Sequence, residues 1–165
     1  DYVSKEVKET LSPSMDIQLA SNFERLIYYV NNSDSEKTAE IMKKVKQNSY
    51  QIEKNNLDII QKDFLSESCN EQETLDIIQK NYEENNIILD PHTAVGVGAA
   101  KKLSFNDCVV LSTAHPCKFP DATNNAINKS EKLPKELQHV LDKVETYQVL
   151  KNNTEDVKNF VKSKL

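Results

Sequence analysis

The chain has only two glycines, Gly96 and Gly98, and both lie in the short stretch 94-AVGVGAAKKL-103. Glycine is the residue that most easily adopts the backbone angles of tight turns. Two glycines this close together cannot serve the several tight turns that a self-sufficient α/β domain needs. The sequence also begins at Asp1 rather than at methionine. We therefore expect a piece of a longer polypeptide.

The composition permits a folded protein and argues against two kinds of partner. Of the 165 residues, 38% are hydrophobic and 28% are charged, and the formal net charge is -5. Apolar residues recur periodically along the chain, so we do not expect disorder. Basic blocks that would bind nucleic acid are lacking, and no apolar run approaches the roughly 18 residues of a membrane span. We expect neither nucleic acid nor a membrane as partner.

The cysteines favour a reducing compartment. Cys69, Cys108 and Cys117 are odd in number and show no C-x-x-C spacing. Reduced thiols, together with the lack of a visible signal peptide, predict a cytoplasmic protein. Cys108 lies within the apolar run 108-CVVL-111, which favours the role of a small core residue.

Hydrophobic periodicity predicts an α/β fold that is rich in helices. Helices are expected over 22–30, 36–47, 71–84, 94–103, 120–127, 134–142 and from Thr154 onward, with Ser21, Asn70 and Thr154 as N-caps. Strands are expected at 87–89, 108–111 and 147–150, with further candidates near 51–52 and 62–65. Because strands alternate with helices, we expect a parallel sheet flanked by helices. Residues 21–84 would be a mainly helical segment and 87–165 the α/β portion of one domain, 1–165.

Reactive side chains gather in 112-STAHPCKFPDA-122, directly after the apolar run. In open α/β sheets, ligands bind beyond the carboxyl ends of the strands. This stretch would present the hydroxyls of Ser112 and Thr113, the imidazole of His115 and the ammonium of Lys118 at that edge. The alternative is a polar loop that only caps the following helix. The residue pattern leaves both interpretations open.

The loop 89-LDPHTAVG-96 is equally ambiguous. Thr93 could cap the next helix, and Asp90 could form an Asx-turn ahead of the proline. Asp90, His92, His115 and Cys117 are potential zinc ligands, but their spacing fits no common zinc motif. We therefore predict no metal site.

Three blocks of sequence together resemble the threonine synthase family, whose members are pyridoxal-phosphate (PLP) enzymes of fold type II. The blocks are 11-LSPSMDIQLASNFERL-26, 88-ILDPHTAVGVGAA-100 and 111-LSTAHPCKFPDA-122. Their order and spacing are similar to the last third of that enzyme, and 133-LPKELQHVL-141 is similar to the segment that follows the last motif. Residues 46–70 are the least diagnostic. Cys117 departs from the small residue usual at that position.

The resemblance implies a lyase of threonine biosynthesis that converts O-phospho-L-homoserine and water to L-threonine and phosphate. It also implies that Thr113, with Ser112 as the neighbouring candidate, contacts the pyridine nitrogen of PLP. A neutral hydroxyl cannot hold that nitrogen protonated as a carboxylate would, so the cofactor becomes a milder electron sink. His115, Lys118 and Arg25 are the implied candidates for contacts with the substrate. The alternative for Arg25 is that it anchors its helix through a carboxylate.

Two parts of a fold type II cofactor site are missing from these 165 residues. There is no Gly-rich loop to cradle the cofactor phosphate, and no lysine in the family's F-K-D setting. We expect both, and with them the catalytic lysine, in an N-terminal region of the same enzyme. The chain alone should be inactive. The alternatives are a non-catalytic helical α/β interaction module and another fold type II PLP lyase.

Overall fold

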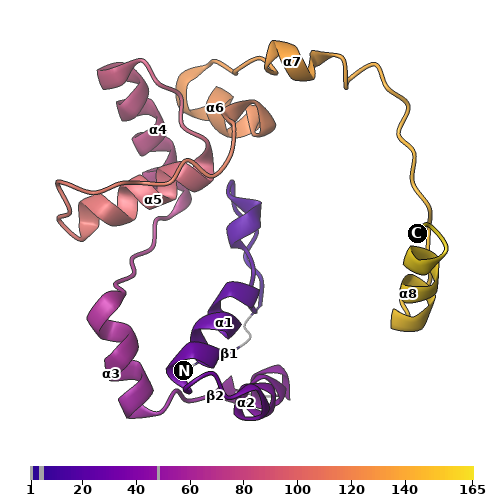
Figure 1. Cartoon of the computed structure of the whole chain (residues 1–165). Helices are drawn as coiled ribbons and strands as arrows, with labels where there is room; N and C mark the ends of the chain where they lie inside the picture. Colours follow the sequence, from indigo (N-terminus) through magenta and orange to yellow (C-terminus); the bar gives the residue numbers. More distant parts are fainter. Residues whose placement is uncertain (1, 4–5, 48) are drawn as a thin grey trace. The chain divides into compact units, whose positions relative to one another are not determined.

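The computed structural model describes residues 2–3, 6–47 and 49–165 (Figure 1). The chain divides into two compact units, Asp1–Lys132 and Leu133–Leu165. Within the described residues, no helix is both long enough and apolar enough to cross a membrane.

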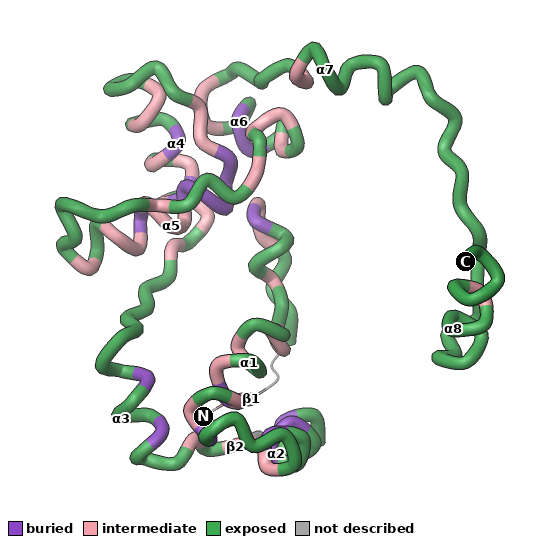
Figure 2. The backbone as a smooth tube through the Cα atoms, in the orientation of Figure 1, coloured by how far each residue is buried: buried purple, intermediate pink, exposed green. Residues whose placement is uncertain are grey.

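The first part of the larger unit contains three helices and a minimal strand pair. The helices are α1 (Ser21–Val30), α2 (Ser35–Gln47) and α3 (Lys54–Asp63), and a 3₁₀ turn, η1 (Pro13–Met15), precedes them. Strands β1 (Tyr2–Val3) and β2 (Ser49–Tyr50) pair antiparallel. Ile27, Ile41 and Val45 are almost fully buried, and they form the core of this part (Figure 2). They come from α1 and α2, whose apolar residues recur at helical spacing.

The second part of the larger unit consists of α4 (Glu71–Asn85), α5 (Pro91–Lys102), a 3₁₀ turn η2 (Pro116–Lys118) and α6 (Pro120–Ile127). Helix α4 packs against both α5 and α6. Small side chains suit this close packing: Ala94 of α5 and Ala122 of α6 are buried, as is Ile78 of α4. A Cβ atom at Gly98 would lie 2.6 Å from Ile77 Cδ1 and closer still to Cys69 Sγ. The glycine therefore allows α5 to approach α4 closely. In an α/β layer, small residues at this place would instead let the helix approach a sheet.

The smaller unit has little packing of its own. It contains α7 (Lys135–Gln138) and α8 (Thr154–Lys162), joined by a segment without regular secondary structure. None of its residues is buried (Figure 2). Val157 and Val161 of α8 are 44% and 52% exposed, so the apolar face of this helix lacks a cover within the unit.

Most of the predicted helices are confirmed. Helices α1, α2, α4 and α6 lie where the periodicity predicts them, and α5, predicted over 94–103, begins earlier, at Pro91. Asn70 caps α4 as predicted, because its side chain accepts a hydrogen bond from Glu73 N–H at 2.9 Å. The cap at Ser21 is wrong: the N-cap of α1 is Ala20, which makes no side-chain bond. The last helix is capped by Asn153 instead of Thr154, and the helix near 134–142 is shorter than predicted.

The predicted parallel sheet is not confirmed. Among the described residues the strands are β1 and β2, two residues each and antiparallel. Residues 87–89, 108–111 and 147–150 form no strand, and the candidate near 62–65 follows or overlaps the end of α3. A strand exists only where a neighbouring strand satisfies its backbone N–H and C=O groups. Val109 is 90% exposed and Leu111 is 75% exposed, so the described residues offer this segment no such neighbour.

Candidate functional site

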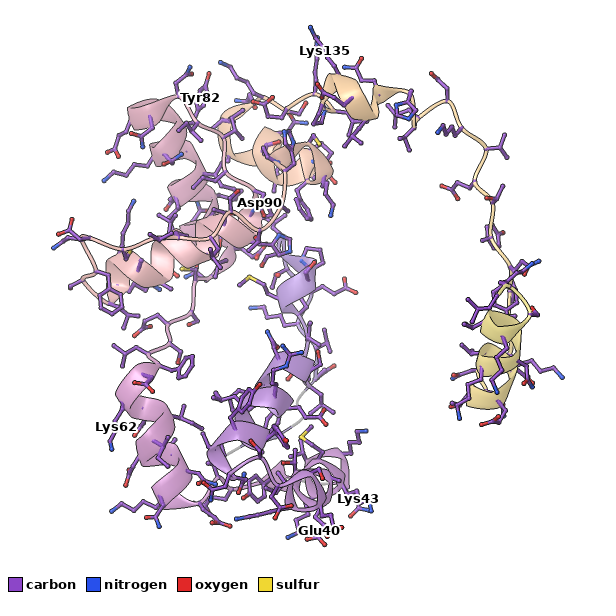
Figure 3. All side chains as sticks on the ribbon, viewed as in Figure 1. Glu40, Lys43, Lys62, Tyr82, Asp90 and Lys135 are labelled. Carbon is purple, nitrogen blue, oxygen red and sulfur yellow. The ribbon has the colours of Figure 1, made fainter. Side chains whose placement is uncertain are left out.

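The start of α5 is organised by the carboxylate of Asp90, which is labelled in Figure 3 and is 1% exposed. Asp90 is the N-cap, and Pro91 occupies the first helical position. Asp90 Oδ1 accepts hydrogen bonds from the backbone N–H groups of His92, at 3.0 Å, and Thr93, at 3.4 Å. A carboxylate at this place satisfies backbone donors that the helix leaves free and interacts favourably with the helix dipole. The cap expected at Thr93 is therefore wrong: the N-cap is Asp90, the residue for which an Asx-turn was the expectation.

His92 links this helix start to the first sequence block. Its Nε2 accepts a hydrogen bond from the backbone N–H of Ser14 at 3.2 Å, and its Nδ1 lies 3.0 Å from Asp90 Oδ1. A backbone N–H can only donate, so Nε2 must be the unprotonated nitrogen. The proton of the neutral ring therefore sits on Nδ1 and is donated to Asp90. The ring also packs against Phe119, with the centroids 4.7 Å apart.

Thr93 links the same helix start to the third sequence block. Its hydroxyl donates a hydrogen bond to Asp90 Oδ2 and accepts one from the backbone N–H of Thr113 at 3.1 Å. Thr93 is buried, whereas Thr113 is exposed. No described residue forms a hydrogen bond with the hydroxyl of Thr113. The backbone of this residue is thus held in place while its side chain remains available.

The loop that carries Ser14 is itself held by Asp16 and by α4. The carboxylate of Asp16 accepts hydrogen bonds from the N–H of Thr10, at 2.8 Å, and from its hydroxyl, at 2.7 Å. The backbone N–H of Leu11 donates to the carboxylate of Glu71, the first residue of α4, at 3.1 Å. The loop therefore has a defined position against the part of the unit that contains Asp90.

A small pocket lies between this loop and the third block. Its volume is about 220 Å³, and its wall includes Thr10 and Pro13 from the loop and Lys118 and Phe119 from the third block. The ammonium of Lys118 lies 5.8 Å from the centre of the Phe119 ring, a distance at which a cation is attracted to the ring face. The pocket is thus adjacent to His92, which packs on the same ring.

The structure brings some of the predicted site residues together and leaves others apart. Ser112 and Thr113 are exposed beside the start of α5. His115 caps η2, because its Nδ1 accepts a hydrogen bond from the Cys117 N–H at 3.2 Å. It does not cap the following helix, α6, whose N-cap is Phe119. Arg25 is an exposed residue of α1. No hydrogen bond or ion pair within the described residues joins it to 112–118.

Sequence reasoning missed the residues that connect the blocks. Asp90, His92 and Thr93 were interpretable only as caps, turn residues or metal ligands, and Ser14 carried no prediction. Their roles depend on which segments meet in space, and the one available signal was that each of the three blocks contributes a member. No group of three or more His, Cys, Asp or Glu side chains able to hold a metal ion occurs within the described part of the chain.

The three cysteines are unpaired. Burial raises the pKa of the Cys69 thiol, which keeps it protonated and unreactive. Cys108 is exposed instead of lying in a core, and Val109 and Leu111 of the same apolar run are also largely uncovered by the described residues.

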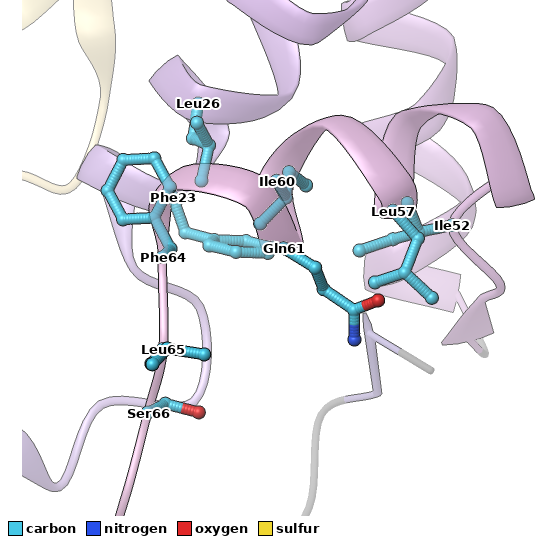
Figure 4. Close-up of a pocket in the computed structure, with 9 residues that line it drawn as sticks. All are labelled: Phe23, Leu26, Ile52, Leu57, Ile60, Gln61, Phe64, Leu65 and Ser66. Carbon is cyan, nitrogen blue, oxygen red and sulfur yellow. The ribbon is translucent and has the colours of Figure 1, made fainter. Parts of the chain in front are cut away.

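A larger pocket, of about 580 Å³, lies between α1 and α3 (Figure 4). Its wall is mainly apolar and holds no titratable side chain; it is formed by Phe23, Leu26, Ile52, Leu57, Ile60, Gln61, Phe64, Leu65 and Ser66. The size of a pocket is a weaker indication of chemistry than polar groups that converge on it. The region around Asp90, His92 and Thr113 is therefore the better candidate site.

Comparison with known proteins identifies the relatives of the chain. Residues 93–161 match the family model "Threonine synthase, C-terminal". The threonine synthase of Saccharomyces cerevisiae is 41% identical in an alignment 162 positions long, which covers 82% of this chain and 32% of that protein. The threonine synthase of Pseudomonas aeruginosa is 34% identical, over 97% of this chain and 35% of that protein.

The likeness extends to three dimensions. The crystal structure of PLP-bound threonine synthase from Brucella melitensis superposes with a TM-score of 0.78 at 33% identity, over 98% of this chain and 36% of that one. The chain thus spans about one third of the length of the curated relatives it matches. Sequence and backbone agree over nearly the whole chain, and the chain accordingly belongs to the threonine synthase family.

Proposed function

We propose that the chain is the C-terminal part of a threonine synthase, a PLP-dependent carbon–oxygen lyase of threonine biosynthesis. The complete enzyme converts O-phospho-L-homoserine and water to L-threonine and phosphate. The observation that carries the proposal is the meeting of the three family blocks at Asp90, through His92 with Ser14 and through Thr93 with Thr113. The similarity to the PLP-bound Brucella melitensis enzyme supports it.

Thr113 fits a contact with the pyridine nitrogen of PLP. Its backbone is held by Thr93, and its side chain is exposed and unused by the described residues. When bound, PLP supplies an electron sink for carbanions formed on the substrate. A hydroxyl partner bonds to the ring nitrogen without fixing a proton there, as a carboxylate would. Ser112 is the neighbouring candidate for the same contact.

Lys118, His115 and Arg25 are proposed to contact the substrate. Lys118 lines the small pocket beside the site, and its ammonium can pair with a phosphate group. His115 uses Nδ1 as an acceptor from Cys117, so its Nε2 is the atom that remains for a substrate. Arg25 lies in the first family block and is exposed. It would reach the substrate only if α1 borders the complete site.

The remaining parts of the site are proposed to come from an N-terminal region of the same enzyme. That region would supply the lysine that binds PLP and a Gly-rich loop for its phosphate. It would also supply sheet neighbours for 87–89, 108–111 and 147–150, which would then become strands of the parallel sheet of a fold type II domain. The exposure of Val109, at 90%, and of Val149, at 86%, supports this.

The domain organisation and location form part of the same proposal. Residues 1–165 would be the C-terminal part of one catalytic domain, with 21–84 a mainly helical segment and 87–165 its α/β portion. Three unpaired cysteines favour a reducing compartment and hence the cytoplasm.

The test is an assay of the full-length protein with PLP and O-phospho-L-homoserine. We expect threonine and phosphate to appear in equal amounts, since one molecule of each leaves per turnover. Another fold type II lyase would release phosphate with a different carbon product. A non-catalytic interaction module would release neither, and that result would refute the proposal. Omission of PLP from an apoprotein preparation is the matched control.

A further inference from the structure

Ser14, Asp90, His92 and Thr93 form a hydrogen-bonded group that we call the hub. The proposed function assigns a cofactor contact to Thr113, and on that basis we propose that the hub is a positioning device for this residue. The hub itself touches Thr113 through the backbone, and it would act on the cofactor only through Thr113.

Only one arrangement of protons satisfies all the bonds of the hub. The Ser14 N–H donates to His92 Nε2, and His92 Nδ1–H donates to Asp90 Oδ1. The Thr93 hydroxyl has one proton, which it donates to Asp90 Oδ2. Its oxygen is then free to accept from the Thr113 N–H at 3.1 Å. Each donor has an acceptor, so the network defines both the tautomer of His92 and the rotamer of Thr93.

Burial makes this arrangement stiff. Asp90 is 1% exposed, Thr93 5% and His92 7%. A buried carboxylate that lost its donors would bear the desolvation penalty of an unpaired charge. Hydrogen bonds of a fully satisfied network in a low-dielectric interior also reinforce one another. Movement of any one member is therefore opposed by the bonds of the others.

The hub holds the segment 112–119 at two separate points. Thr93 accepts the hydrogen bond from the backbone of Thr113, and the ring of His92 packs against Phe119, with centroids 4.7 Å apart. A binding group must be held within about 0.5 Å of its working position to be effective. Two fixed points on one short segment, one of them the backbone of Thr113 itself, can meet this demand for the exposed Thr113 side chain, although Val109 nearby is 90% exposed.

Amide hydrogen exchange of the full-length protein tests the hub without reference to catalysis. In Thr93→Val the acceptor for the Thr113 N–H is lost at nearly constant volume. We expect exchange at this amide to become about 10-fold faster or more, as for loss of one positioned hydrogen bond. Thr93→Ser keeps the hydroxyl and should restore protection. Equal exchange in the wild type and Thr93→Val would overturn the proposal.

Thr74→Val is the matched control. Thr74 is 2% exposed, and its hydroxyl donates to the backbone oxygen of Asn70 in α4 at 2.9 Å, remote in the chain from 112–119. This variant removes a buried threonine hydroxyl with no link to the hub. We expect it to leave both the Thr113 exchange rate and the turnover number unchanged. An equal rise of Thr113 exchange in both variants would mean that the effect is general destabilisation, and would refute the hub.

Two readouts separate positioning from a purely structural role. In Thr93→Val we expect kcat to fall about 10-fold, KM for O-phospho-L-homoserine to stay within about 2-fold, and the absorbance spectrum of bound PLP to shift. Faster Thr113 exchange with unaltered kcat and spectrum would leave the hub a structural element only, and would overturn the positioning role. If the wild-type protein converts no O-phospho-L-homoserine, the proposed function fails, and the exchange measurement still decides whether the hub restrains Thr113.

Substitutions of His92 provide a second route if Thr93→Val does not fold. The amide nitrogen of asparagine can take the place of Nδ1 and donate to Asp90, but it leaves the Ser14 N–H without an acceptor. The longer glutamine side chain can place its oxygen near the position of Nε2. Exchange at the Ser14 amide should therefore be faster in His92→Asn than in His92→Gln. Equal rates at this amide would contradict the hydrogen-bond directions assigned to the hub.

Discussion

At the scale of single residues, the two partners of the Thr113–Thr93 hydrogen bond differ in a way that suits the proposed site. Thr93 is buried and uses its hydroxyl twice, whereas Thr113 is exposed and offers a hydroxyl that no described residue takes. A side chain that is free while its backbone is restrained is suited to binding, because little conformational entropy is lost when a ligand arrives.

Thr113→Val removes the proposed contact with the pyridine nitrogen and keeps the shape of the side chain. In the full-length enzyme we expect PLP to remain bound through its other anchors, and turnover to fall by about 10-fold or more, as for loss of one positioned hydrogen bond. Steady-state kinetics with O-phospho-L-homoserine measures this. Thr113→Ser, which keeps the hydroxyl, should retain most of the activity. Unchanged turnover in Thr113→Val would show that this hydroxyl does not make the proposed contact with the pyridine nitrogen.

The two glycines should respond differently to alanine. At Gly98 the new Cβ would overlap Cys69 and lie 2.6 Å from Ile77 Cδ1, so we expect Gly98→Ala to lower the free energy of unfolding by about 1 kcal/mol or more, despite the better helix propensity of alanine. At Gly96 the nearest atom is Val110 Cγ1, at 3.1 Å, in an irregular segment. Gly96→Ala should therefore be close to neutral. Denaturant titration of both variants tests the contrast.

At the scale of secondary-structure elements, a polar network joins α4 to α5. The ammonium of Lys102, near the end of α5, lies 2.7 Å from the carboxylate of Glu73 and donates to the backbone oxygen of Ser68. Glu73 also accepts a hydrogen bond from the Asn70 N–H at 2.8 Å and so completes the capping box of α4. The pair therefore stabilises a helix start and a helix–helix contact together.

The Glu73–Lys102 pair should make stability depend on pH at both extremes. The hydrogen bond from Lys102 and that from Asn70 lower the pKa of Glu73, and the bond to Glu73 raises the pKa of Lys102. The carboxylate's contribution is present above its ordinary pKa of 4.5 and is lost as the pH falls through the lowered value. The contribution of Lys102 is complete below its ordinary pKa of 10.5 and is lost as the pH rises through the raised value.

Glu73→Gln tests this, because glutamine can still serve the capping box. Unfolding titrations should show the variant to be slightly less stable than the wild type near neutral pH and equally stable at acid pH, below the lowered pKa of Glu73. The effect should be small, since both side chains are 37% exposed. Glu84→Gln is the control. It removes the ion-pair partner of Lys80, and the Glu84 side chain, at 56%, is more exposed than that of Glu73. A difference that persists unchanged at acid pH would contradict the assignment.

At the scale of the whole molecule, apolar surface is left uncovered in both units. In the larger unit, Val109 and Leu111 are exposed. In the smaller unit, Tyr147 is 80% exposed and Val149 is 86% exposed. Exposed apolar patches of this kind mark surfaces that another part of a protein covers. The chain spans about one third of the length of its relatives, and we propose that further residues of the same enzyme, outside 1–165, form the cover.

Residues 1–165 by themselves should therefore be inactive and prone to association. We expect added PLP to produce no new visible absorbance band of bound cofactor, because neither the proposed lysine nor the Gly-rich loop is present. Light scattering and binding of an apolar dye should be higher than for the full-length protein. A clear cofactor band from these residues alone would show that a complete PLP site is present, contrary to the proposal.

Some of this structure could be predicted from local sequence. The bounds of α4 follow from its apolar periodicity and from Asn70, because a helix and its cap involve residues no more than about four positions apart. The family blocks also identified Thr113 as a candidate without any structure. Neither inference needed knowledge of which distant segments meet.

The tertiary structure alone decided how the candidate site is built and which apolar runs remain without a sheet. The Ser14–His92 bond joins residues 78 positions apart, and the Thr113–Thr93 bond joins residues 20 apart. Residues 108–111 have the composition of a strand, yet they form none among the described residues. The physical reason is the same in each case: a hydrogen bond needs both partners, and the second partner is chosen by the folding of remote segments and not by the residues beside the first.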